Sequence, residues 1–178
     1  MELTPISQRF ILHWGEMGAR WGINRTVAQV YALLYISAEP LNAEDIAKTL
    51  SVARSNVSTS LRELQGWRII KVAHVLGDRR DHFTATKDVC QTFQRILDER
   101  KRREVDPTLE VLQACVAELD AGDSRDDYVR QHLLDLLDFF ATMVSLYEEV
   151  RRLPSDRLPQ IVKLRGKMRK LLALDRSG

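Results

Sequence analysis

Residues 54–64 carry side chains that can form hydrogen bonds with nucleic acid on most sides of a predicted helix. Val57, Leu61 and Leu64 recur at helical spacing and would face the interior of a domain. The other faces carry short polar or basic residues, namely Arg54, Ser55, Asn56, Ser58, Thr59 and Arg62. Such side chains can bind base edges and phosphate oxygens. The pattern therefore indicates a helix that reads DNA, although an exposed polar face alone is equally typical of a helix that merely faces solvent.

A second basic group follows at a predicted β-hairpin. Residues 68–75 and 81–85 predict two strands, and a Gly-Asp pair between them favours a tight turn. Arg79 and Arg80 would then lie at the tip of this wing, where they can follow the DNA backbone or enter a minor groove. Asp78 would hold one of the two guanidinium groups while the other meets DNA. All three residues are therefore candidate contacts of the wing.

The elements that position these residues follow the order of a winged helix-turn-helix. Asn24 is a suitable N-cap for a helix over about 25–37. Asn42 and Asp45 form a variant of the capping box at the start of a short helix. A tight connection then leads directly into the polar-faced helix. The predicted fold is mainly α, a winged helix-turn-helix with a two-stranded wing, followed by a C-terminal helical dimerisation region.

We expect residues 1–86 to form the DNA-binding domain and residues 87–178 the helical dimerisation region, which is also a possible effector region. Within the second part, apolar residues recur in steps of four and three: Val129, Leu133, Leu136, Phe140, Met143, Tyr147 and Val150. A strict heptad stripe is typical of a two-fold helical interface. Packing against neighbouring helices of the same chain is the alternative. A last helix is expected over about 156–174.

Three segments of the chain resemble the MarR-type winged-helix transcriptional regulators, in particular their GbsR-like branch. They are GINRTVAQVYALLYIS at 22–37, LNAEDIAKTLSVARSNVSTSLREL at 41–64 and GDRRDHFTAT at 77–86. In this family an aspartate and an arginine two positions on recur at the wing, and here they are Asp78 and Arg80. The resemblance implies a cytoplasmic homodimer that binds a pseudo-palindromic operator in double-stranded DNA, usually as a repressor. It also implies a small-molecule or stress signal, which in the GbsR-like branch can concern compatible solutes.

Aromatic residues are candidates for an effector pocket. They cluster in two regions of the chain and comprise Trp14, Trp21, Tyr31, Tyr35, Tyr128 and Tyr147. Aromatic rings can enclose a quaternary ammonium group through cation–π contacts. Aromatic residues at helical spacing are more often part of a core, so the alternative is a regulator that has no ligand at this place.

Enzyme, cofactor, metal and membrane functions find no support in the sequence. The motifs HExxH, CxxC, GxSxG, Walker A and GxGxxG are all missing. His74 and His82 flank Asp78, but two histidines make at most half of a metal site. No apolar run approaches the ~20 residues of a membrane span.

The distribution of charged residues and the two cysteines narrow the functional class of the protein further. The net charge is only +2, but residues 54–80 carry six basic and two acidic residues. Two cysteines within helical patterns favour a reducing cytoplasm over a disulfide framework. We therefore expect a sequence-specific transcription factor. A winged-helix module that binds another protein is the alternative, and exposed apolar anchors on the helix at 54–64 would favour it.

Overall fold

The computed structural model describes residues 3–121 and 126–152. Close contacts divide the chain into two units, Met1–Arg95 and Ile96–Gly178, and each unit is described by itself. The helix expected over 156–174 lies outside the described residues. The division that the sequence suggests, between residues 86 and 87, stays a prediction.

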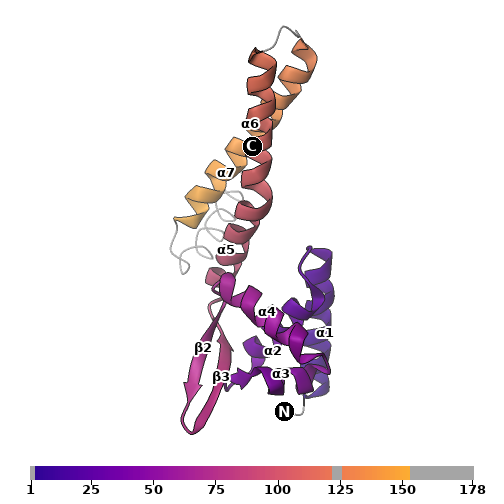
Figure 1. Ribbon diagram of the computed structural model, residues 1–178, viewed down its shortest axis with the longest axis vertical. Helices are drawn as coiled ribbons and strands as arrows, with labels where there is room; N and C mark the ends of the chain where they lie inside the picture. Colours follow the sequence, from indigo (N-terminus) through magenta and orange to yellow (C-terminus); the bar gives the residue numbers. More distant parts are fainter. Residues whose placement is uncertain (1–2, 122–125, 153–178) are drawn as a thin grey trace, which may run out of the picture. The chain divides into compact units, whose positions relative to one another are not determined.

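The first unit begins with two helices (Figure 1): α1, Pro5–Arg20, and α2, Arg25–Ile36. The predicted cap of α2 is confirmed, because Asn24 Oδ1 accepts a hydrogen bond of 2.8 Å from the backbone N–H of Thr26. The helices approach so closely that a Cβ atom on Gly18 would lie 2.5 Å from Ala28 Cβ. Most of α2 is buried, so this helix is the centre of the core.

The helix-turn-helix follows as β1, Leu41–Asn42, then α3, Ala43–Leu50, and α4, Arg54–Gly66. The capping box is confirmed. Asn42 Oδ1 accepts from the backbone N–H groups of Glu44 and Asp45, both at 3.0 Å, and Asn42 Nδ2 donates to Asp45 Oδ2 at 2.7 Å. The stripe predicted to face inward is also confirmed, because Val57, Leu61 and Leu64 are all buried.

The wing is the antiparallel pair β2, Ile70–Val75, and β3, Asp78–Ala85. The two-stranded hairpin is confirmed, but β1 joins β3 at its base, so the sheet has the order β1-β3-β2. Leu41 pairs with Phe83, and Asn42 pairs with His82.

The strand β3 begins three residues earlier than the sequence pattern predicts. Gly77 has a φ of 84°, which is a conformation that glycine adopts readily, and the turn is completed before Asp78. Arg79 and Arg80 therefore lie within a strand, so their expected position at the tip of the wing is wrong.

The second unit contains the end of α5, Val89–Arg100, a π-helical segment η1, Lys101–Val105, and two long helices, α6, Asp106–Ala121, and α7, Asp127–Arg151. The helix α6 begins at Asp106 directly after η1, without an intervening loop. Proline at position 107 has no N–H to donate and would crowd the carbonyl four residues earlier, which lies within η1. Figure 1 shows α6 and α7 as an antiparallel pair.

Candidate nucleic-acid interface

The outer face of α4 is open to solvent along its whole length. All six polar or basic residues predicted to contact DNA are exposed there: Arg54, Ser55, Asn56, Ser58, Thr59 and Arg62. Ala53 at the N-cap offers no side-chain hydrogen bond to the first turn. Backbone N–H groups at such a helix start can donate to a phosphate. The helix thus presents hydrogen-bonding side chains and an uncapped N-terminus on one surface.

The wing holds one arginine in a fixed orientation. Arg80 donates from Nε to both carboxylate oxygens of Asp78 at 3.0 Å, and from Nη2 to Oδ2 at 2.5 Å. The backbone N–H of Arg80 also donates to Asp78 Oδ1 at 3.0 Å. These hydrogen bonds hold the pKa of Asp78 well below its usual range. The arginine that the aspartate orients is thus Arg80, and its neighbour Arg79 is exposed.

His82 supports the same aspartate from within the strand. Its side chain is buried, its Nδ1 lies 2.9 Å from the carbonyl oxygen of Arg80, and its Nε2 lies 3.6 Å from Asp78 Oδ2. Within residues 3–121 and 126–152, no group of three or more His, Cys, Asp or Glu side chains is placed to hold a metal ion. The contacts of His82 with Arg80 and Asp78 make it a buried polar residue of the strand.

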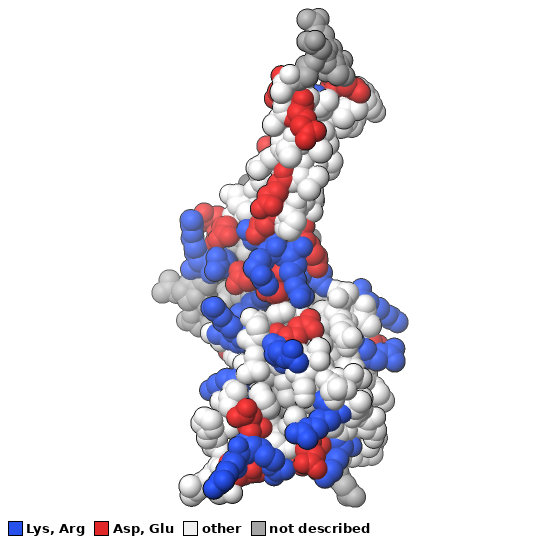
Figure 2. Space-filling model, viewed as in Figure 1, with Lys and Arg blue, Asp and Glu red and all other residues white. Residues whose placement is uncertain are grey.

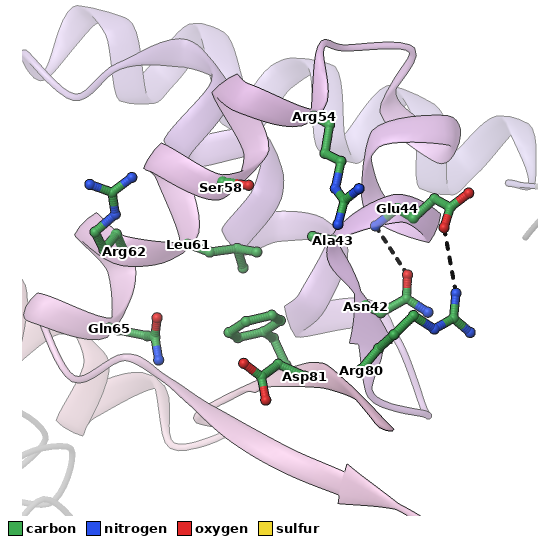
Figure 3. A pocket seen from close by; sticks show the side chains of 11 residues that line it. Asn42, Ala43, Glu44, Arg54, Ser58, Leu61, Arg62, Gln65, Arg80 and Asp81 are labelled. Atoms are coloured by element: carbon green, nitrogen blue, oxygen red, sulfur yellow. Dashed lines mark hydrogen bonds and ion pairs between the residues drawn. The ribbon is translucent and has the colours of Figure 1, made fainter. Parts of the chain in front are cut away.

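A polar cavity of about 360 Å³ lies between α3, α4 and the wing (Figure 3). Arg54 and Arg62 line it from α4, and Arg80 lines it from β3. Glu44, on α3, lies 3.6 Å from the guanidinium of Arg80. Glu44 was not predicted from the sequence, because its contact depends on Arg80, which lies in β3 and 36 residues further along the chain.

The amino-acid sequence is similar to those of known transcriptional regulators. The family model of the MarR family matches residues 21–81, which span α2, the helix-turn-helix and the start of β3. The chain is 24% identical over 136 residues to the HTH-type transcriptional repressor GbsR of Bacillus subtilis, with 75% of each chain covered. It is 22% identical over 158 residues to the putative HTH-type transcriptional regulator YvaV of the same organism, covering 82% of this chain and 89% of the relative. The chain is a DNA-binding transcriptional regulator, and its residues 21–81 match the MarR family.

Structural similarity shows the same fold. The crystal structure of a transcriptional regulator superposes with a TM-score of 0.64 at 17% sequence identity, covering 83% of this chain and 96% of the other. The mainly helical fold with a small wing and a helical C-terminal part, as predicted, is therefore confirmed for the regulator. The matched family and the named relatives are transcriptional regulators and not enzymes.

The helices α6 and α7 of the regulator leave a large apolar surface exposed. None of their described side chains is fully buried. The exposed apolar side chains of α7 form a stripe, which we call the α7 stripe: Val129, Leu136, Phe139, Met143 and Leu146. Figure 2 shows broad uncharged areas and acidic side chains over these two helices.

The α7 stripe overlaps the predicted heptad only in part. Leu133, Phe140 and Tyr147 are half-buried, whereas Phe139 and Leu146, each 58% exposed, were not predicted. The side chain of Val150 lies outside the described residues. The sequence also contains a second apolar stripe, Leu134, Leu137, Ala141 and Val144, of which Leu134, Leu137 and Val144 are half-buried.

The predicted effector residues are distributed over both units. Tyr31 is buried, stacks on Tyr35 with ring centroids 6.0 Å apart, and donates its hydroxyl to Thr92 Oγ1 at 3.4 Å. Trp21 is half exposed, Trp14 packs against Phe10, and Tyr128 is 74% exposed. Tyr147 donates to Asp98 Oδ1 at 2.6 Å. Tyr31 thus has the contacts of a core residue, and the effector pocket stays a prediction.

Proposed function

We propose that this regulator represses transcription by binding a pseudo-palindromic DNA site as a homodimer, with one copy of α4 in the major groove of each half-site. The exposed polar face of α4 beside the oriented Arg80 is the observation that carries the proposal. The relative named a transcriptional repressor supports the sign of regulation. Residues 1–86 would bind DNA and residues 87–178 would dimerise.

Residue roles within the interface follow from position on α4. The first turn of a recognition helix usually enters the groove most deeply. Arg54, Ser55, Asn56 and Thr59 would therefore read bases, while Ser58 and Arg62 would bind phosphates. The protein-binding alternative is less well supported, because among the described residues no large apolar side chain is exposed on α4.

The proposal is tested by selecting duplexes from a random library with the purified chain and mapping the protected bases. We expect two protected half-sites with centres about 10–10.5 base pairs apart, or a multiple of that distance. The affinity should fall steeply with salt, because each neutralised phosphate releases about 0.9 of a counterion. A footprint that covers one half-site and is produced by a monomer would contradict the proposal.

We propose that two copies dimerise through the α7 stripe, which would produce the two-fold arrangement. Leu146 is exposed in the single chain, and a second copy would remove it from water. Leu146→Asp should shift the sedimentation coefficient from that of a dimer to that of a monomer. Leu76→Asp is the matched control, since Leu76 is fully exposed in the turn of the wing. A dimer that survives Leu146→Asp would move the interface elsewhere.

A small-molecule effector and a cytoplasmic location complete the proposal. Free Cys90 and Cys115 agree with a reducing compartment. Aromatic side chains can hold a quaternary ammonium solute, and its binding would change the fluorescence of Trp14 and Trp21. Titrating such solutes into the protein–DNA complex at constant salt tests this part. Unchanged DNA affinity and unchanged fluorescence would remove the support for these ligands. We propose no enzymatic activity.

A further inference from the structure

Glu44 lines the polar cavity at the point where α3, α4 and the wing come together. Its carboxylate projects from the first turn of α3, where Oε1 lies 3.2 Å from Lys48 Nζ and Oε2 lies 3.6 Å from Arg80 Nη1. In Figure 3, Arg54 extends from the start of α4 toward the same end of α3. The pKa of Glu44 is lowered, chiefly by the ammonium group of Lys48 and further by Arg80 and Arg54. The carboxylate is therefore charged at neutral pH and surrounded by cations from α3, α4 and the wing.

Arg80 is held from two directions. Asp78 orients the guanidinium within the wing itself, through three side-chain contacts. Glu44 holds the same guanidinium from α3, a different element. Because α3 leads into α4 through a short connection, a contact to Glu44 fixes Arg80 relative to the recognition helix and not merely relative to the wing.

The carboxylate of Glu44 lies where its negative charge would lower the affinity for DNA. It lies in the cavity lined by Arg54 and Arg62, on the face that carries the proposed phosphate contacts. A negative charge there repels phosphates of any sequence. A residue that weakens binding to all DNA and still aligns two DNA-reading elements raises the preference for a particular site over other DNA.

We propose that Glu44 is a positioning residue for DNA specificity, which aligns Arg80 of the wing with α4 and disfavours binding to DNA of unrelated sequence. The inference rests on the proposed function, because it concerns the same interface. The quantity that it predicts is the ratio of two dissociation constants, one for unrelated DNA and one for the selected site. A purely structural role of Glu44 would leave this ratio unchanged.

Two substitutions separate the effect of the charge of Glu44 from the effect of its side-chain length. Glu44→Gln removes the negative charge, so we expect unrelated DNA to bind ~2–5-fold more tightly while the selected duplex gains little. Glu44→Asp keeps the charge but withdraws it from Arg80, so we expect the selected duplex to bind ~2–5-fold more weakly while unrelated DNA is unaffected. The ratio falls in both variants. Glu44 is exposed, so both variants should melt like the wild type.

The measurement uses the full chain with two duplexes, the best one from the selection experiment and a scrambled duplex of the same length and composition. Glu39→Gln, which removes an exposed carboxylate before β1, is the charge-matched control and should leave the ratio unchanged. In an Arg80→Gln background, the substitutions of Glu44 should no longer change the ratio, because the partner is gone.

The outcomes distinguish this inference from the proposed function. A wild-type chain that binds both duplexes equally would overturn the proposed function and this inference with it. A wild-type chain that prefers the selected duplex, with the same ratio in Glu44→Gln and Glu44→Asp, would overturn this inference alone. A fall of the ratio that persists in the Arg80→Gln background would show that Glu44 does not act through Arg80, which also overturns it.

Discussion

Lys87 donates a hydrogen bond of 2.5 Å from its ammonium group to the backbone carbonyl of Tyr35, at the end of α2. The same ammonium donates to the carbonyls of Leu34 at 3.2 Å and Ser37 at 3.0 Å, and it lies 5.5 Å from the centre of the Tyr35 ring. The last carbonyls of a helix have no partner within the helix and carry a partial negative charge. Lys87 thus ties the segment before α5 to the central helix of the core.

Replacing Lys87 with methionine should destabilise the fold. Methionine keeps the apolar stem but loses the charge and the hydrogen bonds to three carbonyls, so we expect the free energy of unfolding to fall by about 1–2 kcal/mol. Urea unfolding measures this change. Lys71→Met, at an exposed position of β2, is the control and should stay within about 0.5 kcal/mol of the wild type. Equal effects of the two substitutions would show that the carbonyl contacts contribute nothing.

Asn56→Ala should relax specificity at one base pair of the selected site. Asparagine can bind adenine through two hydrogen bonds, and losing such a pair costs about 1–3 kcal/mol of discrimination. Binding assays with single-base variants of the duplex locate the affected position. Arg62→Ala is the comparison, because loss of a phosphate contact weakens binding to all sequences and reduces the salt slope by about one. Equal weakening on every duplex by Asn56→Ala would assign Asn56 to the backbone.

The direction in which Asp78→Ala changes the affinity for DNA tests whether Asp78 orients Arg80. Asp78→Ala removes an anion near the DNA, which on Coulomb grounds alone would tighten binding. We expect weaker binding instead, because the guanidinium of Arg80 loses the partner that orients it. The melting temperature should hardly change, since an exposed ion pair contributes little to stability. Tighter binding would leave Asp78 with a charge effect only.

Tyr147 should make the free energy of unfolding fall as the pH rises above about 10. Burial and the hydrogen bond to Asp98 raise the pKa of its hydroxyl. A group whose pKa is higher in the folded state stabilises the fold below its unfolded pKa, here about 10, and loses this contribution as the pH rises further. Unfolding in denaturant at pH 8 and pH 10.5 should therefore show a larger loss for the wild type than for Tyr147→Phe. Parallel losses in the two proteins would contradict the assignment.

The features that the sequence predicts correctly are local. The caps at Asn24 and Asn42 and the stripe of Val57, Leu61 and Leu64 involve residues at most seven positions apart, where helix geometry alone determines which side chains meet. The polar face of α4 follows from the same periodicity. The arrangement of helices around the candidate DNA interface was therefore visible in the sequence.

The features that the sequence does not reveal depend on distant partners. The two residues of β1 are too few to show a strand period, and their partners in β3 lie about 40 residues later. The contact between Glu44 and Arg80 requires the same long-range pairing. On α7 apolar residues occur on several sides of the helix, and only the packing within the second unit determines that Phe139 is exposed while Leu133 is half-buried. Turn geometry at Gly77, and not composition, places Arg79 within the strand.

The wing is supported by a third strand only at its base, because β1 pairs with β3 there and not near the turn. Near Phe83 and His82, β3 is clamped on both edges, by β1 and by β2. Toward the turn the described ribbon is two-stranded, and its register is irregular between Ala73 and Val75. We therefore expect the wing to bend mainly in its outer, two-stranded half, and the contact of Arg80 with Glu44 lies near the end of the three-stranded part. Such a wing would keep its base aligned with α4 while its outer half would adjust to minor grooves of different width.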